Sequence, residues 1–166
     1  TVAAIYVLWY AIFKTHSNIG LFSKGEDEAW ELIRKINFVF NLLPEFLKPR
    51  IDKNRRDYID FPDIGSRIKA YPSTPNAGSG YTFSLVVRDE LDKHPYAEQN
   101  FAAVGPAIDA GGKLINLGSR DYMVSKENSH LVARYLKARN GEIPAIAIFL
   151  GWKERPVRQK GVSLDE

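Results

Sequence analysis

Short apolar segments of strand length alternate along this chain with longer segments of helical character, and this alternation restricts the fold more than any other feature. The apolar runs suit strands that are buried within a sheet. Because strands and helices take turns, the pattern predicts an α/β fold with a mostly parallel sheet and helices on both faces. The predicted strands are Asn18–Ser23, Thr82–Arg88, Lys113–Leu117 and Ala145–Leu150.

The segments between these strands have helical periodicity. The first is apolar nearly all round, which implies burial on most of its sides, and it is shorter than the roughly 20 residues that span a bilayer. Ser23 and Glu26 have the spacing of a capping box before the second, and Gly105-Pro106 must bend or interrupt the third. The predicted helices are Thr1–Thr15, Gly25 to Leu43, Tyr96–Ala110 and Lys126–Arg139.

A hairpin is predicted between the second helix and the loop at residues 72–80. Arg56–Phe61 and Ser66–Tyr71 alternate like strands, and Pro62-Asp63-Ile64-Gly65 between them has the composition of a turn. A second turn is predicted at Gly111-Gly112, where glycine allows the positive φ that a tight connection needs. The first turn would make two of the predicted strands antiparallel neighbours.

Composition limits the classes of function. The 166 residues suit one domain, and the absence of Cys excludes disulfides and thiolate metal sites. The net charge of +3 permits nucleic-acid binding without requiring it. Nothing indicates a signal peptide or a membrane partner. The main basic cluster is interrupted by Asp52 and is interpreted as a solvated loop rather than a phosphate contact; it comprises Lys48, Arg50, Lys53, Arg55 and Arg56.

Two adjacent carboxylates, Asp89 and Glu90, follow the apolar strand that ends at Arg88. Open α/β sheets place their ligands at the carboxyl ends of the strands. Two acids at such an end can divide the work of nucleotide hydrolysis, the first holding Mg²⁺ and the second orienting or deprotonating the attacking water. The alternative is a strand that simply meets solvent.

Several separate segments, taken in order, give this chain a family resemblance that runs from about Thr1 to about Arg158. With these segments it resembles the ATPase domain of the large terminase subunit, the DNA-packaging motor of tailed bacteriophages. The resemblance implies a P-loop NTPase fold of the RecA-like (ASCE) type and the use of ATP and Mg²⁺. The segments that carry it are Ser66–Thr82, Leu85–Glu90, His94–Glu98 and Pro106–Ser119.

The resemblance also implies roles for single residues. Asp89 and Glu90 match the Walker B pair, with Asp89 holding Mg²⁺ and Glu90 as the catalytic glutamate. Ser119 stands where the family has its coupling motif, although Gly118-Ser119 replaces the usual Ser-Thr pair, and an ordinary strand-to-loop serine remains the alternative. Ser79 stands where relatives carry an arginine that can act on a neighbouring subunit's ATP, a role that Arg67 or Arg88 could take over.

One family element does not occur in the sequence, namely the P-loop, Gly-x-x-x-x-Gly-Lys-Ser/Thr, which binds the β- and γ-phosphates. In the family it lies immediately before a helix corresponding to Thr1–Thr15. The chain is therefore interpreted as an internal piece of a longer protein that lacks the first strand, the P-loop and the nuclease domain. Residues 1–151 would be the partial ATPase domain and residues 152–166 a linker toward the nuclease domain.

The expected partners follow from the resemblance. They are double-stranded DNA, the portal protein, the small terminase subunit and further copies of the subunit in a ring, in the host cell cytoplasm and transiently at the procapsid portal. Two alternatives stay open. One is another motor ATPase with a strand that ends in two acids, such as a helicase. The other is a catalytically silent assembly or DNA-binding module, which the missing P-loop and Ser79 would suit.

Overall fold

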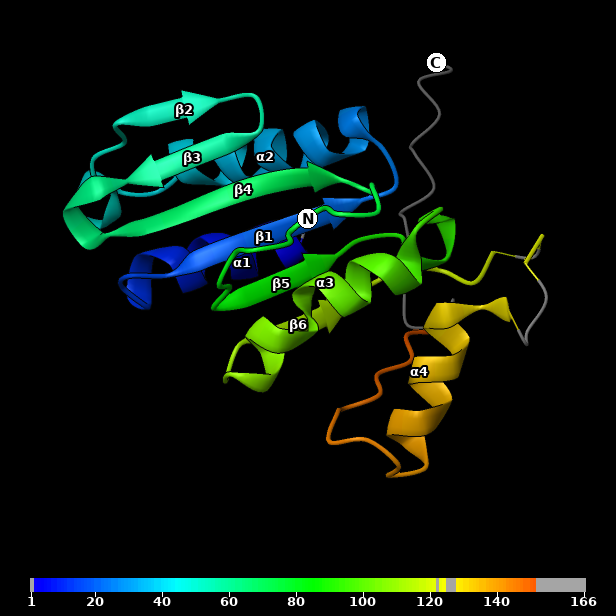
Figure 1. Ribbon diagram of the computed structural model, residues 1–166. Helices are drawn as coiled ribbons and strands as arrows, with labels where there is room; N and C mark the ends of the chain where they lie inside the picture. Colours follow the sequence, from blue (N-terminus) through cyan, green and yellow to red (C-terminus); the bar gives the residue numbers. More distant parts are fainter. Residues whose placement is uncertain (1, 122, 125–127, 152–166) are drawn as a thin grey trace, which may run out of the picture.

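The computed structural model describes residues 2–121, 123–124 and 128–151, which form a layered α/β fold around one six-stranded sheet (Figure 1). The strands are β1 (Asn18–Ser23), β2 (Lys53–Arg55), β3 (Tyr58–Phe61), β4 (Ser66–Pro72), β5 (Leu85–Arg88) and β6 (Lys113–Asn116). The helices are α1 (Val2–Phe13), α2 (Glu26–Asn41), α3 (Ala97–Asp109) and α4 (His130–Arg139). Three short 3₁₀ turns are η1 (Glu45–Leu47), η2 (Pro62–Ile64) and η3 (Leu91–Lys93).

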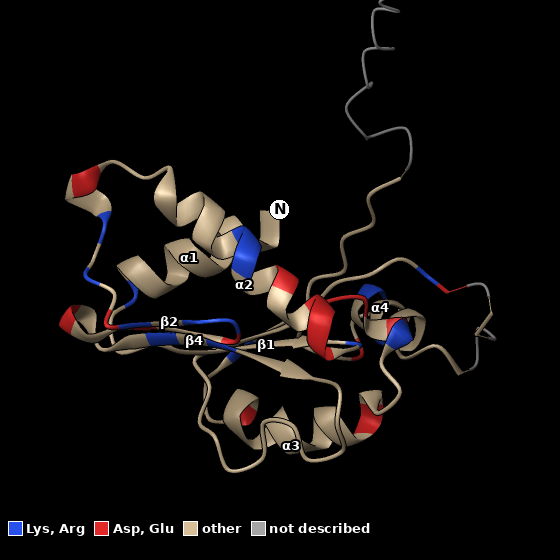
Figure 2. Cartoon of the chain, turned by 90° about the horizontal axis from the view of Figure 1, so that it is seen from above, with Lys and Arg blue, Asp and Glu red and all other residues tan. Residues whose placement is uncertain are grey.

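The sheet is mixed and mostly parallel, in the order β2-β3-β4-β1-β5-β6. β4, β1, β5 and β6 run parallel, whereas β2 and β3 are antiparallel neighbours at one edge. Helices α1 and α2 lie on one face and α3 lies on the other (Figure 2). The predicted α/β class, the mainly parallel sheet and the helices on both faces are therefore confirmed.

The sheet separates two apolar cores, because successive strand residues point to opposite faces. Ile19 and Leu21 of β1 pack beneath α1 and α2, whereas Phe22 packs on the other face with Phe83 and with Val104 of α3. Burying each such side chain contributes about 1.5–3 kcal/mol. Both faces of the central strands are thus anchored, and their carboxyl ends are held rigidly.

Helix α1 is buried or half-buried on most of its sides, as predicted, but it exposes one apolar stripe. Ala4, Val7, Leu8 and Ala11 are buried against α2 and the sheet. The opposite side carries Trp9, which is 45% exposed, among other exposed apolar residues. A helix that lies on one face of a sheet leaves exposed the stripe that faces away from the sheet, and this apolar stripe was not predicted. Within the described residues, no helix has the length and apolar character to cross a membrane.

The predicted hairpin is confirmed as β3 and β4. They are joined by η2 and by Gly65, whose φ of 65° is the left-handed conformation expected at such a turn. The strand β2 pairs with β3, although its residues had been assigned to a solvated loop. The predicted turn at Gly111-Gly112 is also found, between α3 and β6. The antiparallel half of the sheet is thus one strand wider than predicted.

One local prediction about helices is wrong, and of the bend or interruption predicted for another helix the interruption is excluded. Ser23 and Glu26 form no capping box, because Ser23 is the last residue of β1 and is paired with Pro72, and Gly25 caps α2 instead. Pro106 does not interrupt α3, which runs through it. The N–H that proline lacks therefore leaves only a local gap in the hydrogen bonding of this helix.

The predicted strand Ala145–Leu150 is not formed. These residues take no regular structure, and Ile146 is 90% exposed. An apolar run becomes a strand only when another strand supplies its hydrogen bonds, and the described sheet does not pair with it. Helix α4 begins at His130, whereas the predicted start at residues 126 and 127 and the predicted linker at residues 152–166 lie outside the described residues.

Candidate active site

The acidic residues and Ser119 follow two neighbouring parallel strands. β5 pairs with β6 in a register that sets Arg88 beside Asn116. Beyond the strands, the backbone of Leu117 continues the pairing: its N–H donates to Arg88 O at 2.8 Å and its oxygen accepts from Leu91 N at 3.0 Å. Asp89 and Ser119 therefore lie at the same carboxyl end of the sheet, as the sequence predicted.

Asp89 is held mainly through its backbone. Its N–H donates to Phe22 O of β1 at 2.9 Å, and its own carbonyl oxygen accepts from Nε2 of His94 at 2.7 Å. The carboxylate oxygen Oδ1 accepts from Glu90 N at 3.1 Å. The half-buried side chain is thus fixed at the end of the central strands, with carboxylate oxygen available for a hard cation.

Glu90 has an unusual backbone conformation. Its φ of 54° and ψ of 47° are left-handed, which non-glycine residues adopt rarely and at a cost of about 1–3 kcal/mol. Its carboxylate Oε2 pairs with Lys93 Nζ at 2.5 Å, and this contact raises the pKa of Lys93. To act on a water molecule, the glutamate would have to share its carboxylate with Lys93.

Gly118 lets two loops approach each other closely at this end of the sheet. Residues 89–93, which follow β5, are called the acidic loop below. A Cβ at position 118 would lie 3.2 Å from Leu91 N and 3.4 Å from Glu90 Cα, so a side chain there would press on the acidic loop. Glycine lets the loop that carries the exposed Ser119 run directly beside Glu90. The two loops therefore run close together through their backbones, although no hydrogen bond between Ser119 and either acid is found among the described residues.

Arg88 is buried, with 1% of its surface exposed, and lies between β5 and α3. Its Nη2 donates to Ala97 O at 2.5 Å, and Nε has no partner among the described residues. Burial, and to a lesser degree the charge of Arg134, lowers its pKa to about 10. In this arrangement Arg88 cannot reach a neighbouring subunit, whereas Arg67 is exposed but lies on β4, in the other half of the sheet.

The loop before β5 contains Ser79 between two glycines with positive φ. A Cβ on Gly78 would meet Phe22 Cζ at 2.7 Å, so Gly78 lets the loop close over the core beneath α3. Ser79 and Gly80 are exposed. The position where the family resemblance implies an arginine is thus presented to solvent, but the side chain of Ser79 is an uncharged hydroxyl.

Sequence reasoning missed Asp92, which joins the acidic loop to α4. Its carboxylate accepts from Ser129 Oγ at 2.8 Å and from Leu131 N at 3.0 Å. Ser129 in turn caps α4 by accepting from Val132 N at 3.0 Å. A serine before the helix is a recognisable capping signal, whereas nothing in the sequence around Asp92 indicates its distant partners.

The acidic side chains at this end of the sheet suit Mg²⁺ that is shared with phosphates and water. They do not suit a metal ion that is held by protein ligands alone. Within the described ranges no group of three or more His, Asp or Glu could enclose an ion. Mg²⁺ in nucleotide enzymes is commonly bound by one or two carboxylates together with substrate phosphates and water. A single rigid carboxylate such as Asp89 is compatible with that mode.

Comparison with solved structures shows the same fold in phage terminases. The large terminase of bacteriophage HK97 superposes with a TM-score of 0.73 at 15% identity, covering 90% of this chain and 32% of that protein. For a large terminase from a thermophilic bacteriophage the TM-score is 0.61 at 16% identity, covering 84% and 34%. The ATPase domain of a Thermus phage large terminase gives 0.55 at 14%, covering 72% and 54%.

The chain thus spans about a third to a half of the length of these solved relatives. Family membership rests on a separate match. Residues 1–113 match the family described as "Terminase large subunit, T4likevirus-type, N-terminal". This range includes α1, the acidic residues after β5 and all of α3. The chain therefore belongs to the N-terminal region of the large terminase subunit family.

Proposed function

We propose that the subunit to which this chain belongs hydrolyses ATP at the carboxyl end of the sheet and uses the energy to move double-stranded DNA into a capsid. The observation that carries the proposal is the rigid placement of Asp89 and Glu90 after β5, beside the Ser119 loop, in a chain of the terminase family. A P-loop outside this sequence would hold the phosphates.

Each residue has a distinct part in this proposal. Asp89 would hold Mg²⁺, which neutralises phosphate charge when bound. Glu90 would orient the attacking water and accept its proton, which requires its carboxylate to exchange contacts with Lys93. Ser119 would report hydrolysis to the rest of the domain, because its loop runs against the backbone of Glu90.

The assembly would be that of a packaging motor. Copies of the subunit would form a ring on the portal protein of the procapsid, in the host cytoplasm, with the small terminase subunit delivering DNA. ATP and Mg²⁺ are its proposed cofactors. Family membership supports these partners.

The test is a pair of measurements on the full-length subunit: ATP affinity and turnover. Glu90→Gln keeps the shape of the side chain but removes its basicity, so we expect turnover to fall by about 10²- to 10⁴-fold while ATP still binds. Asp89→Asn should instead weaken the Mg²⁺-dependent part of binding. Asp109→Asn, an exposed acid at the end of α3, is the matched control and should retain turnover.

Near-normal turnover in Glu90→Gln would move the catalytic role to another residue. A further expectation concerns the isolated 166-residue chain, which should hydrolyse ATP negligibly because its sequence contains no P-loop. Robust turnover by this chain that disappears in Glu90→Gln would contradict that expectation.

A further inference from the structure

Strands β2, β3 and β4 form the antiparallel half of the sheet, and one face of this half is covered by no helix among the described residues. Helices α1 and α2 pack on the opposite face, and α3 lies beyond it, beside β1 and β5 (Figures 1 and 2). On β4, Ile68 and Ala70 point into the core beneath α1 and α2, so Arg67 and Lys69 point to the uncovered face. The strand geometry therefore fixes these two cations on the same side.

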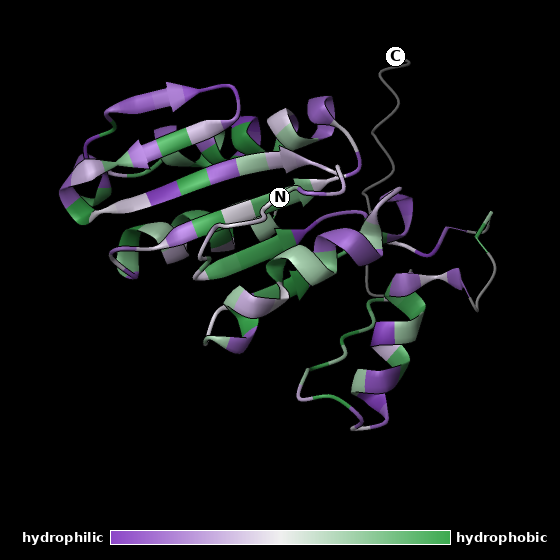
Figure 3. Ribbon diagram, viewed as in Figure 1, coloured by the Kyte–Doolittle hydropathy of each residue, from purple (hydrophilic) through white to green (hydrophobic). Residues whose placement is uncertain are grey.

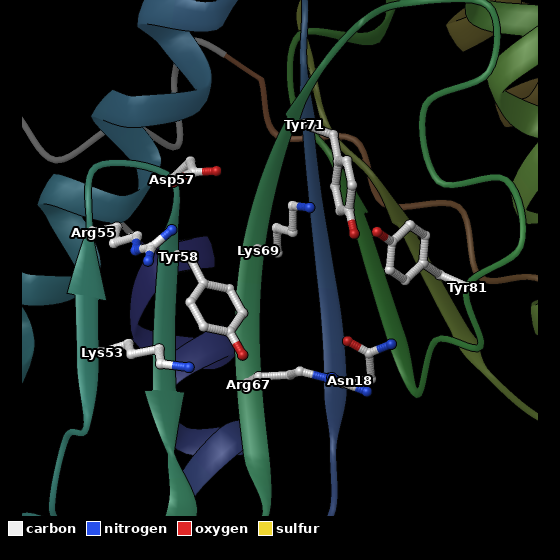
Figure 4. Close-up of a pocket in the computed structure, with 9 residues that line it drawn as sticks. All are labelled: Asn18, Lys53, Arg55, Asp57, Tyr58, Arg67, Lys69, Tyr71 and Tyr81. Atoms are coloured by element: carbon white, nitrogen blue, oxygen red, sulfur yellow. The ribbon is translucent and has the colours of Figure 1, made fainter.

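A shallow cavity of about 320 Å³ lies on this face. Figure 4 shows its lining side chains, which come from β1, β2, β3 and β4 and from the loops beside them. Residues far apart in the sequence thus contribute to one surface, which we call the basic face. Its lining residues are Asn18, Lys53, Arg55, Asp57, Tyr58, Arg67, Lys69, Tyr71 and Tyr81.

Positive charge on the basic face is not neutralised. None of its four cations forms an ion pair with a carboxylate among the residues that the structure describes. Asp57 is the one acid in the lining, and Asp60 lies in register between Lys53 and Arg67. By contrast, Lys48 and Arg50, from the adjacent loop, pair with Glu45 and Asp63. The cations of the basic face are thus left free for an external anion.

The tyrosines add hydrogen-bond donors and flat surface. Tyr58 Oη donates to Asp60 at 3.0 Å and so occupies part of that carboxylate. Lys69 Nζ lies 5.0 Å and 5.4 Å from the ring centroids of Tyr71 and Tyr81. Burial raises the pKa of Tyr58 and Tyr71 further above neutral pH, where both hydroxyls are protonated. Around the cavity, the charged groups are mostly cations, and the hydroxyls of Tyr71 and Tyr81 add donor groups.

We propose that the basic face binds the phosphate backbone of DNA. Arg, Lys, Tyr and Asn side chains are the usual donors to phosphate oxygens in protein–DNA complexes. The shallow cavity would receive phosphates of one strand while the flanking cations contact its neighbours. A rigid sheet presents these groups at fixed spacing, unlike a solvated loop. The choice of DNA over other polyanions rests on the proposed packaging function, which this surface would serve by holding the DNA.

The first test measures how salt weakens DNA binding by the full-length subunit, without nucleotide, using fluorescence anisotropy of a labelled duplex of mixed sequence. Lys53→Gln/Arg67→Gln removes two exposed cations of the basic face. Each lost phosphate contact should reduce the slope of log K against log salt by about 0.9, so the double variant should lose about 1.8. Affinity at about 0.1 M salt should fall by roughly 10- to 100-fold.

The matched control is Lys48→Gln/Arg50→Gln, which removes the same charge from cations that are already paired. Its slope should stay near that of the unaltered subunit. Equal reductions of the salt slope in both double variants would show a general charge effect and would overturn the proposal. An unchanged slope in Lys53→Gln/Arg67→Gln would overturn it as well. Stronger competition by RNA or by polyglutamate than by DNA would likewise overturn it in favour of another partner.

The second test locates the contact, because a nuclease domain in the full-length subunit would also bind DNA. A photo-crosslinking p-benzoylphenylalanine in place of Tyr81 should give a DNA adduct. The same replacement at Phe46, which is exposed in η1, should give none. Absence of an adduct at Tyr81, with an adduct at Phe46, would refute the assignment. Neither experiment involves ATP hydrolysis, so failure here is distinguishable from failure of the catalytic proposal.

Discussion

His94 supports Asp89 from a position that is only 6% exposed. A carbonyl oxygen can only accept, so the bond to Asp89 O requires the proton on Nε2. Nδ1 then carries a lone pair, and it has no partner among the described residues. Protonating it would bury a positive charge beside Arg88, and burial is the main cause that lowers the pKa of His94.

This burial predicts a loss of stability in mild acid. Because the folded pKa lies below the unfolded value of about 6.5, the unfolded chain binds the proton first. The contribution is complete above that value and decreases as the pH falls through it toward the folded pKa, by at most about 1.4 kcal/mol per pH unit. His94→Gln should flatten this part of the curve, as measured by urea unfolding at several pH values.

The matched control for that measurement is His16→Gln, which removes an exposed imidazole instead of a buried one. Parallel curves for the unaltered chain and His94→Gln would show that His94 does not carry the effect.

At the scale of single residues, the sequence predicted where a residue lies in the sheet better than its backbone conformation or its burial. Asp89 and Ser119 were placed at one end of the sheet because parallel strands share their carboxyl edge. The left-handed backbone of Glu90 and the burial of Arg88 were not predicted. Both depend on contacts with segments that the local pattern does not specify, namely the β6 loop and α3.

At the scale of elements, Asp92 fastens α4 to the acidic loop. Its carboxylate accepts from the capping hydroxyl of Ser129 and from Leu131 N, and its negative charge lies at the end where the helix dipole is positive. The first turn of α4 therefore depends on a residue of η3. A change in the acidic loop would be passed directly to this helix.

We expect Asp92→Ala to loosen α4 without unfolding the sheet. The loss of the capping contacts should cost about 1–2 kcal/mol, so amides of residues 131–139 should exchange hydrogen about 5- to 30-fold faster, as measured by mass spectrometry. Asp109→Ala, at the exposed end of α3, should leave α4 unaffected. Unchanged exchange in α4 after Asp92→Ala would mean that other contacts hold this helix.

Strands and turns were predicted well where the residues of the element itself mark it. The strands β1, β5 and β6 and the hairpin were found because apolar runs and turn residues mark them. β2 was missed because Lys53, Asn54 and Arg55 are all polar and exposed. This short strand exists because β3 supplies its hydrogen bonds, and its residues Lys53 and Arg55 form part of the basic face.

At the scale of the whole molecule, the two halves of the sheet differ in how they are covered. The central strands β1 and β5 are buried on both faces, and β5 leads directly into the acids at one end of the sheet. Strands β2, β3 and β4 are covered by helices α1 and α2 on one face only, and hydrophilic residues recur along them (Figure 3). The cations of the basic face lie on the other face. Sequence pattern predicted every strand of the described sheet except β2, whereas the basic face became visible only when β2, β3 and β4 brought distant cations together.

The unpaired segment Ala145–Leu150 has a consequence for how the chain behaves at high concentration. It is six residues long, apolar, uncharged and free of proline, which is the signature of segments that form steric zippers between stacked copies. Because it is already exposed in the folded state, no unfolding step protects it. We expect the isolated chain to form fibrils that bind thioflavin T. Ile148→Lys should lengthen the lag before fibrils form. Met123→Lys, an equal charge change at another exposed apolar residue, should not lengthen it. Equal lags in the two variants would place the fibril core elsewhere.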